Sequence, residues 1–252
     1  GDGLARLIDD GARRPAFAMH RGGVSDRIER GIATAVEGIA IDAATNVAHR
    51  VHVNARIVVA ACGAVETPAL LMRSSVEHPR LGCNLYLHPT TAVAGRYDEP
   101  VRGWIGPPQT VLCDELGRLR GNYGVRFETA PLHPGLLALA LPWYSAREHR
   151  ARMQQAAHVS GFIVLSRDRE TGRVRLDREG RAVIDYSVGT MERALLQRGI
   201  STAARIHRAA GAVEIQTLHT TDLSYDVRAT ARSGDFEAYL DELERAPVHG
   251  NR

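Results

Sequence analysis

A cysteine, a glycine and a threonine that could contact a ligand lie close together within residues 62–67. Gly63 has no Cβ, so the backbone there can turn tightly or approach a bound molecule closely. Thr67 supplies a capping hydroxyl, Glu66 an acidic first turn, and Pro68 suits the first position of a helix. A strand, a glycine turn and a helix form the unit with which α/β folds bind nucleotides. The same unit also occurs as an ordinary crossover without a ligand, and the spacing alone leaves both readings open.

The elements before Gly63 indicate part of an α/β unit. Residues 57–61 are continuously apolar and β-branched at their front, which predicts a strand covered on both faces, as in a parallel sheet. Residues 35–42 and 47–53 alternate in polarity on either side of a turn and predict a β-hairpin. Shorter patterns predict a helix at 4–12 and strands at 16–19 and 24–29.

The sequence changes character near His88 and Pro89, where proline, glycine and histidine become frequent. Beyond this point, alternating segments with turn residues between them predict an antiparallel sheet, with the strands from 158 to 186 in one meander. The longest helix is expected over residues 190–210, with Gly211 as its C-terminal cap. The other predicted elements are strands at 91–97, near 111, and at 123–128 and 212–217, and helices at 146–157 and 235–245.

These patterns predict an α+β protein made of successive parts. A partial α/β unit is expected over residues 1–88, an antiparallel sheet with helices over 89–230, and a final segment over 231–252.

Charge and composition exclude several classes of function. The net charge is +3, and every one of the 32 basic residues is arginine, interspersed with Asp and Glu. Such a mixed surface, with only 5% aromatic residues, does not predict nucleic-acid binding. The longest apolar runs, 57–65 and 135–143, fall short of the roughly 20 residues that span a bilayer.

The cysteines indicate a reducing compartment. Three cysteines are an odd number in 252 residues, so a disulfide framework is not expected. Their spacing matches no zinc motif, and we expect no metal site. The first residues are polar and acidic, and we expect no signal peptide. A cytoplasmic protein, or one attached peripherally to a membrane, is the resulting expectation.

No histidine or carboxylate pattern identifies a catalytic base. The histidines considered are scattered and form no Ser/His/Asp or Cys/His arrangement: they are His133, His149, His158, His207 and His219. His207 lies on the apolar face of the long helix, where a hydrogen-bonded core histidine is favoured over a catalytic one. Asp168, Glu170 and Asp177 are predicted to lie on hairpin surfaces. The apolar run 135–143 fits the wall of a substrate channel, but a core segment is the favoured reading.

Two segments together resemble a known family: AACGAVETPALL at 60–71 and GCNLYLHP at 82–89. They are similar to the second signature region of the GMC (glucose–methanol–choline) oxidoreductases, and most similar to the long-chain (fatty) alcohol oxidase branch. HPGLLA at 133–138, LPW at 141–143 and IHRAAGA at 206–212 also look like that branch. The resemblance covers nearly the whole chain, and the order and spacing of these short motifs carry it.

The resemblance implies an FAD-dependent flavoprotein that oxidises primary alcohols, with long-chain alcohols favoured. Residues 1–88 would be the C-terminal part of an FAD-binding Rossmann-like domain, 89–230 a substrate-binding domain, and 231–252 a return segment towards the FAD domain. The positions that match the family's flavin-side residues are Cys62, Gly63, Ala64, Thr67, Asn84, His88 and Pro89. For His88 a hydrogen-bonded loop histidine remains an equal alternative.

Two parts of the family pattern are missing. The G-x-G-x-x-G fingerprint is absent, and the motif that carries the catalytic histidine would follow just after Arg252. We therefore expect a middle fragment that is inactive alone, place no catalytic residue in it, and expect the missing flavin-domain segments elsewhere, for example on another chain. The alternative is a truncated or orphan module without catalysis that binds apolar ligands or a partner chain.

Overall fold

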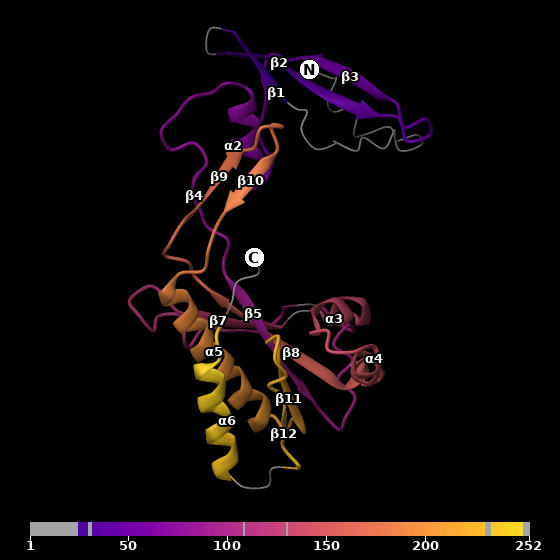
Figure 1. The fold of residues 1–252 in the computed structure, drawn as a ribbon, viewed down its shortest axis with the longest axis vertical. Helices are drawn as coiled ribbons and strands as arrows, with labels where there is room; N and C mark the ends of the chain where they lie inside the picture. The colour runs from indigo at the N-terminus through magenta and orange to yellow at the C-terminus, as the bar shows by residue number, and fades with distance from the viewer. Residues whose placement is uncertain (1–24, 30–31, 108, 130, 230–232, 249–252) are drawn as a thin grey trace. The chain divides into compact units, whose positions relative to one another are not determined.

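The computed structural model describes residues 25–29, 32–107, 109–129, 131–229 and 233–248 (Figure 1). It divides into two compact units. The first unit comprises Gly1–Leu85 and Thr171–Tyr186, and the second comprises Tyr86–Glu170 and Ser187–Arg252. The helix predicted at 4–12 and the strand predicted at 16–19 lie outside the described residues.

The first unit contains two small antiparallel sheets. Strands β1 (Ser25–Glu29), β2 (Ile32–Ile41) and β3 (Ala48–Asn54) form the first sheet, which confirms the predicted hairpin. The turn between β2 and β3 is closed by Asp42, whose Oδ1 accepts hydrogen bonds from the backbone N–H groups of Ala44 and Thr45. These hydrogen bonds to the carboxylate lower the pKa of Asp42.

The second sheet of this unit carries helix α2 (Gly63–Arg73). Its strands are β4 (Cys83–Leu85), β9 (Gly172–Leu176) and β10 (Ala182–Asp185), in the order β10-β9-β4. Ala69, Leu85 and Val174 form a buried cluster that joins the helix to the sheet. The hairpin of β9 and β10 therefore packs with the early part of the chain, although our predicted domain range placed it in residues 89–230.

Two predictions in this unit are wrong. Residues 57–61 form no strand, and the side chains of Ile57 and Val59 are 80% and 78% exposed. A buried parallel strand needs hydrogen-bonding neighbours on its edges, and no described strand pairs with this run. Helix α2 also begins at Gly63, so Pro68 lies inside the helix rather than at its first position. Proline has no N–H, so the helical hydrogen bond from position 68 to the carbonyl of Ala64 is missing.

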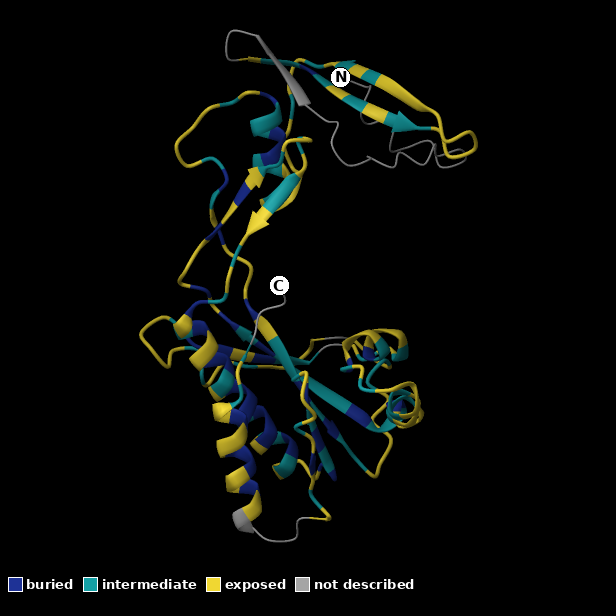
Figure 2. Cartoon of the chain, in the orientation of Figure 1, coloured by how far each residue is buried: buried dark blue, intermediate teal, exposed yellow. Residues whose placement is uncertain are grey.

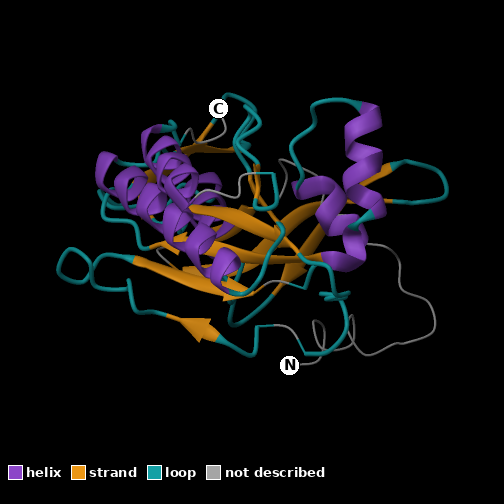
Figure 3. Cartoon of the chain, turned by 90° about the horizontal axis from the view of Figure 1, so that it is seen from below, coloured by secondary structure: helices purple, strands orange, loops and turns teal. Residues whose placement is uncertain are grey.

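The second unit is a six-stranded sheet with helices on both faces (Figure 3). The strands are β5 (Thr90–Arg96), β6 (Leu112–Cys113), β7 (Val125–Thr129), β8 (Val159–Ser166), β11 (Glu214–Thr217) and β12 (Tyr225–Asp226). They are paired antiparallel in the order β12-β11-β5-β8-β7-β6. The helices are α3 (Pro134–Ala140), α4 (Ala146–Gln154), the 3₁₀ helix η1 (Ala156–His158), α5 (Thr190–Ala209) and α6 (Ser233–Arg245).

The main core lies between the sheet and helix α5. Buried residues run along one side of α5, as Figure 2 shows, and include Leu196 and Ile200. Val93, on β5, belongs to this core, whereas its neighbour Ala94 packs against a second cluster, which contains Leu137 of α3. Because successive strand residues point to opposite faces, α5 and the α3–α4 pair cover opposite faces of the sheet.

The sheets do not follow the predicted meander. Strands β9 and β10 form a hairpin, but β8 belongs to the six-stranded sheet and does not pair with β9. The chain leaves the second unit after Glu170, which separates the two strands. All strand pairs among the described residues are antiparallel and are accompanied by helices, as the α+β prediction requires. No helix in the described part of the chain combines the length and the apolar character that a membrane span needs.

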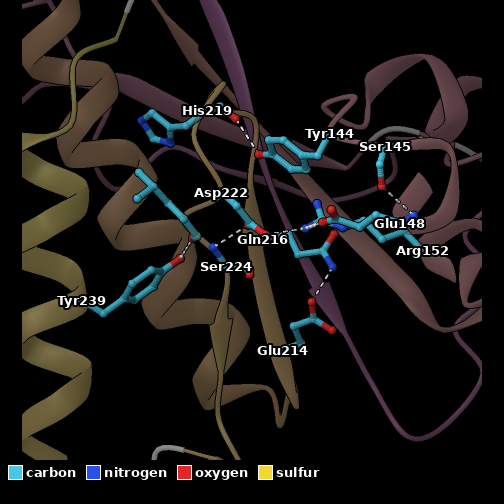
Figure 4. A network of polar contacts seen from close by, with 11 residues as sticks. Tyr144, Ser145, Glu148, Arg152, Glu214, Gln216, His219, Asp222, Ser224 and Tyr239 are labelled. Atoms are coloured by element: carbon cyan, nitrogen blue, oxygen red, sulfur yellow. Dashed lines mark hydrogen bonds and ion pairs between the residues drawn. The ribbon is translucent and has the colours of Figure 1, made fainter.

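A polar network fastens α4 to the segment that joins β11 and β12 (Figure 4). Arg152 is 11% exposed and pairs with Asp222 at 3.0 Å and with Glu148 at 2.8 Å. The Tyr144 hydroxyl donates to the carbonyl of His219 at 2.9 Å. Burial of Tyr144, followed by the charge of Asp222, raises the pKa of that phenol.

Candidate functional site

The predicted residues 62–67 come together at the start of helix α2. Cys62 is the N-cap residue, and its backbone N–H donates to the Thr67 hydroxyl at 3.0 Å. Gly63 has a φ of +78°, a conformation that glycine adopts without steric cost, and no atom lies within 4 Å of the point where its Cβ would stand. Cys62, Gly63 and Ala64 are exposed. The turn therefore presents free space beside Gly63, next to a first helical turn whose N–H groups have no partner within the helix.

Asn84 lies at an irregularity of strand β4 in the same unit. Cys83 pairs with Arg173 and Leu85 with Gly172, so Asn84 is an extra residue between two consecutive ladder positions. Its φ is +61°, and its side chain is exposed. A bulge of this kind redirects a side chain and is over-represented next to active sites.

His88 and Pro89 belong to the second unit, so the structure does not bring them together with the α2 turn in one compact body. His88 is exposed and has a φ of +49°. Pro89 is buried, and its carbonyl accepts a hydrogen bond from the backbone of Ser166 at 2.9 Å. The Thr90 hydroxyl donates to the carbonyl of His88 at 2.8 Å. These contacts fix the entry of the chain into β5.

The His88 segment is held by a carboxylate that the sequence did not identify. Asp168 was predicted on a hairpin surface, but it is only 4% exposed. Its carboxylate accepts the backbone N–H of Leu87 at 2.7 Å and that of His88 at 3.3 Å. The partners are 81 and 80 positions away in the sequence, so no local pattern could have revealed the contact.

His88 also lines a pocket of the second unit, with a volume of about 890 Å³. Arg126 and Glu128 contribute from β7, where they alternate with the core residues Val125 and Phe127. They therefore lie on the sheet face opposite α5. The other lining residues are Asp114, Glu115, Gly117, Arg118, Asn122, Gly124, Leu165, Ser166 and Arg167.

The pocket is polar, with three arginines and three carboxylates around it. No ion pair joins these six groups to one another among the described residues. Arg167 lies instead over the ring of Tyr123, with its guanidinium carbon 5.7 Å from the ring centre. The pocket therefore offers hydrogen-bonding groups of both signs to a ligand.

The histidines have structural roles where their contacts are clear. His207 is fully buried: its Nε2 donates to the carbonyl of Val93 at 3.1 Å, and the Tyr97 hydroxyl donates to its Nδ1 at 2.8 Å. This confirms the prediction of a core histidine. Burial lowers the pKa of His207 to about 4, partly offset by the hydrogen bond to Val93, so the ring is neutral near pH 7. His133 accepts the N–H of Gly135 and caps α3.

The apolar run 135–143 lies largely within α3. Leu137 is buried at 3% exposure, as the core reading predicts. Leu136, Leu139 and Trp143 are 54%, 85% and 67% exposed, so the same segment also presents apolar surface. The core prediction thus holds for Leu137, whereas a substrate-channel wall formed by the exposed residues stays a prediction. No group of three or more histidine, cysteine or acidic side chains that could hold a metal ion occurs in the described ranges.

The known proteins that this chain matches include GMC-type oxidoreductases and long-chain-alcohol oxidases. The sequence model of the family described as GMC oxidoreductase matches residues 17–90. A long-chain-alcohol oxidase of Arabidopsis thaliana, FAO4A, is 30% identical over 208 residues, which are 78% of this chain and 28% of that protein. A second one, FAO3, is 28% identical over 209 residues, or 79% of this chain and 27% of the relative. An uncharacterized GMC-type oxidoreductase of Mycobacterium tuberculosis is 38% identical over 161 residues, covering 64% of this chain and 25% of that protein. The chain spans about a quarter of the length of these relatives.

Proposed function

Because the chain belongs to the GMC oxidoreductase family, we propose that it forms part of an FAD-dependent enzyme that oxidises the CH–OH group of primary alcohols. Long-chain alcohols are the proposed substrates, since relatives that match more than three quarters of the chain are named long-chain-alcohol oxidases. One observation carries the proposal. The residues with exposed, left-handed backbone at Gly63, Asn84 and His88 all fall within the segment 17–90 that matches the family.

The residues at these positions fit the contacts that a flavin requires. The open space at Gly63 allows a flat ring or a phosphate to approach the backbone N–H groups of the first turn of α2. Asn84 has an exposed amide that can donate to a carbonyl oxygen. Positive φ values in non-glycine residues cost free energy and concentrate at ligand sites, and both Asn84 and His88 have them.

We assign a holding role to each proposed flavin-side residue. Gly63 and Ala64 present backbone donors, while Cys62 caps the helix and its N–H donates to the Thr67 hydroxyl, which fixes the turn. Asn84 and His88 present side chains, and the buried Pro89 fixes the entry of β5. When bound, FAD accepts the hydride that leaves the alcohol carbon. The base that takes the hydroxyl proton and the phosphate-binding loop would come from other segments of the enzyme, on the same or another chain.

The substrate side is proposed on the face of the six-stranded sheet opposite α5. The polar pocket around His88 would receive the alcohol head group. The exposed leucines of α3 and Trp143 would contact a long apolar chain. We propose a cytoplasmic enzyme, either free or attached peripherally to a membrane. Peripheral attachment would bring the enzyme to its substrates, since long-chain alcohols partition into lipid.

A titration with FAD tests this function. A complete enzyme that contains this segment should bind FAD, and its flavin absorption band should bleach when a long-chain primary alcohol is added. Asn84→Ala should weaken FAD binding by about tenfold, as expected for the loss of one buried hydrogen bond, whereas Asn54→Ala at the end of β3 should leave it unchanged. A complete enzyme that contains this segment and stays colourless with excess FAD would contradict the proposal.

The second candidate is a module without catalysis that binds an apolar ligand or a partner chain. Exposure of Leu136, Leu139 and Trp143 is the observation that favours it. In that case a long-chain alcohol would bind the protein whether or not FAD is present, and no flavin spectrum would appear.

A further inference from the structure

Two buried carboxylates lie close to the points where the chain passes between the compact units. The chain crosses after Leu85, after Glu170 and after Tyr186. Asp168 precedes the second crossing and is 4% exposed, and Glu192 follows the third and is 1% exposed. Burial of a carboxylate is unfavourable unless hydrogen bonds compensate for the lost water. The partners of these two side chains therefore show what they hold in place.

Asp168 holds the segment that follows the first crossing. Its Oδ2 accepts the N–H of Leu87 at 2.7 Å, and both of its oxygens lie 3.3 Å from the backbone nitrogen of His88. Hydrogen bonds to an ionised acceptor are stronger than those between neutral groups. They act here on a backbone that has a φ of +49° at His88, where L-residues are seldom found. The conformation persists because its neighbours impose it.

Glu192 in turn holds the residues that follow Asp168. Its Oε1 accepts the N–H of Arg169 at 2.6 Å and that of Glu170 at 3.4 Å. Gly189 leaves room for this contact, since a Cβ there would stand 2.2 Å from Oε2 of Glu192. Glu192 belongs to the first turn of α5, which is anchored in the main core. A continuous path of contacts thus leads from α5 through Glu192 and Asp168 to His88.

We propose that Asp168 is a positioning residue, which keeps Leu87 and His88 in the backbone conformation that places His88 at the polar pocket, and that Glu192 keeps Asp168 in position. The importance of this arrangement for cofactor binding rests on the proposed function, in which His88 is a flavin-side residue. The arrangement itself is a property of the second unit and can be tested separately.

Amide hydrogen exchange on Asp168→Asn tests the arrangement. Asparagine has the same shape but no charge, and its NH₂ group cannot accept a backbone N–H. We expect the amides of Leu87 and His88 to exchange about tenfold faster or more, while amides of β8 keep their wild-type rates. Asp241→Asn, which changes an exposed carboxylate on α6, is the matched control and should alter neither. Unchanged rates at Leu87 and His88, or an equal increase across the whole second unit, would overturn the positioning role.

A second variant keeps the test decisive if Asp168→Asn fails to fold. Glu192→Gln retains an oxygen acceptor but loses the charge, and should speed the exchange of the Arg169 and Glu170 amides first, with a smaller increase at Leu87 and His88. An increase confined to Arg169 and Glu170 would overturn the link to Asp168.

Titration with FAD then separates this inference from the proposed function. If a complete enzyme that contains this segment binds FAD, its Asp168→Asn variant should bind it about tenfold more weakly, and its Asp241→Asn variant equally well. If Asp168→Asn binds FAD as tightly as the wild-type protein, despite faster exchange at His88, Asp168 has no role in cofactor binding. If that complete enzyme binds no FAD, the proposed function fails, and the exchange rates still decide whether Asp168 positions His88.

Discussion

Burial of His207 lowers the pKa of its ring, and the second unit should therefore lose stability at acidic pH. The ring is fully buried, and this burial lowers its pKa from 6.5 to about 4. The folded state therefore keeps the ring neutral, whereas the unfolded chain takes up a proton below about pH 6.5. Because the unfolded state binds more protons between these values, stability is full above pH 6.5 and is lost as the pH falls towards 4.

The size of this effect follows from the same pKa difference. The difference between the pKa values of the unfolded and folded states corresponds to about 3 kcal/mol of unfolding free energy. About 2 kcal/mol of this is lost between pH 7 and pH 5. His219, whose pKa is also lowered by burial, adds to the loss in the same direction. Replacement of His207 by Phe should remove most of the dependence. It should also cost about 1–3 kcal/mol at pH 7, because the carbonyl of Val93 and the hydroxyl of Tyr97 lose their partner.

Urea unfolding followed by circular dichroism at several pH values between 5 and 7 measures both quantities, and an NMR titration of the imidazole measures the pKa directly. His49→Gln, on the exposed side of β3, is the control and should keep the wild-type slope. A His207 midpoint near 6.5, or a His207→Phe variant with the wild-type slope, would refute the reasoning.

Two further predictions concern the α2 turn and the polar network of α4. Thr67→Val should destabilise the turn by about 1 kcal/mol, because the N–H of Cys62 loses its acceptor, while Thr67→Ser keeps the hydroxyl; equal thermal midpoints for the two variants would show that the bond is unimportant. Arg152→Met should cost about 1–3 kcal/mol, since it leaves Asp222 without its partly buried partner. Arg245→Met, with its guanidinium exposed and 3.7 Å from a carboxylate, should change the thermal midpoint little, and a similar loss in both variants would contradict this account.

The sequence predicted elements well where local pattern decides them. The hairpin of β2 and β3, the long helix α5 with Gly211 after it, and the core position of His207 follow from alternation, helical spacing and capping. These signals act within a few residues of one another, so they are complete in the sequence.

The predictions from sequence failed where contacts with residues far away in the chain decide the structure. Residues 57–61 have the composition of a buried strand but no neighbouring strand in the described part of the chain. Strand β9 was expected beside β8 but pairs with β4, because the chain changes units between β8 and β9. Asp168 resembles a surface residue in its local sequence, and its burial depends on backbone groups about 80 positions earlier. For the candidate site, the sequence singled out Gly63, Asn84 and His88, which are exposed, but not Asp168, which holds the backbone of His88.

The late pairing of strand β4 also determines when the first unit can finish folding during synthesis. Cys83 meets Arg173, which lies 90 positions further along the chain. Until the ribosome has produced β9 and β10, the cluster of Ala69, Leu85 and Val174 has no third member, and one side of helix α2 remains open to solvent. The six-stranded sheet already has β5, β7 and β8 by then, although α5 follows only later. A nascent chain would therefore expose the apolar side of α2 while the residues between Arg73 and Gly172 are being made.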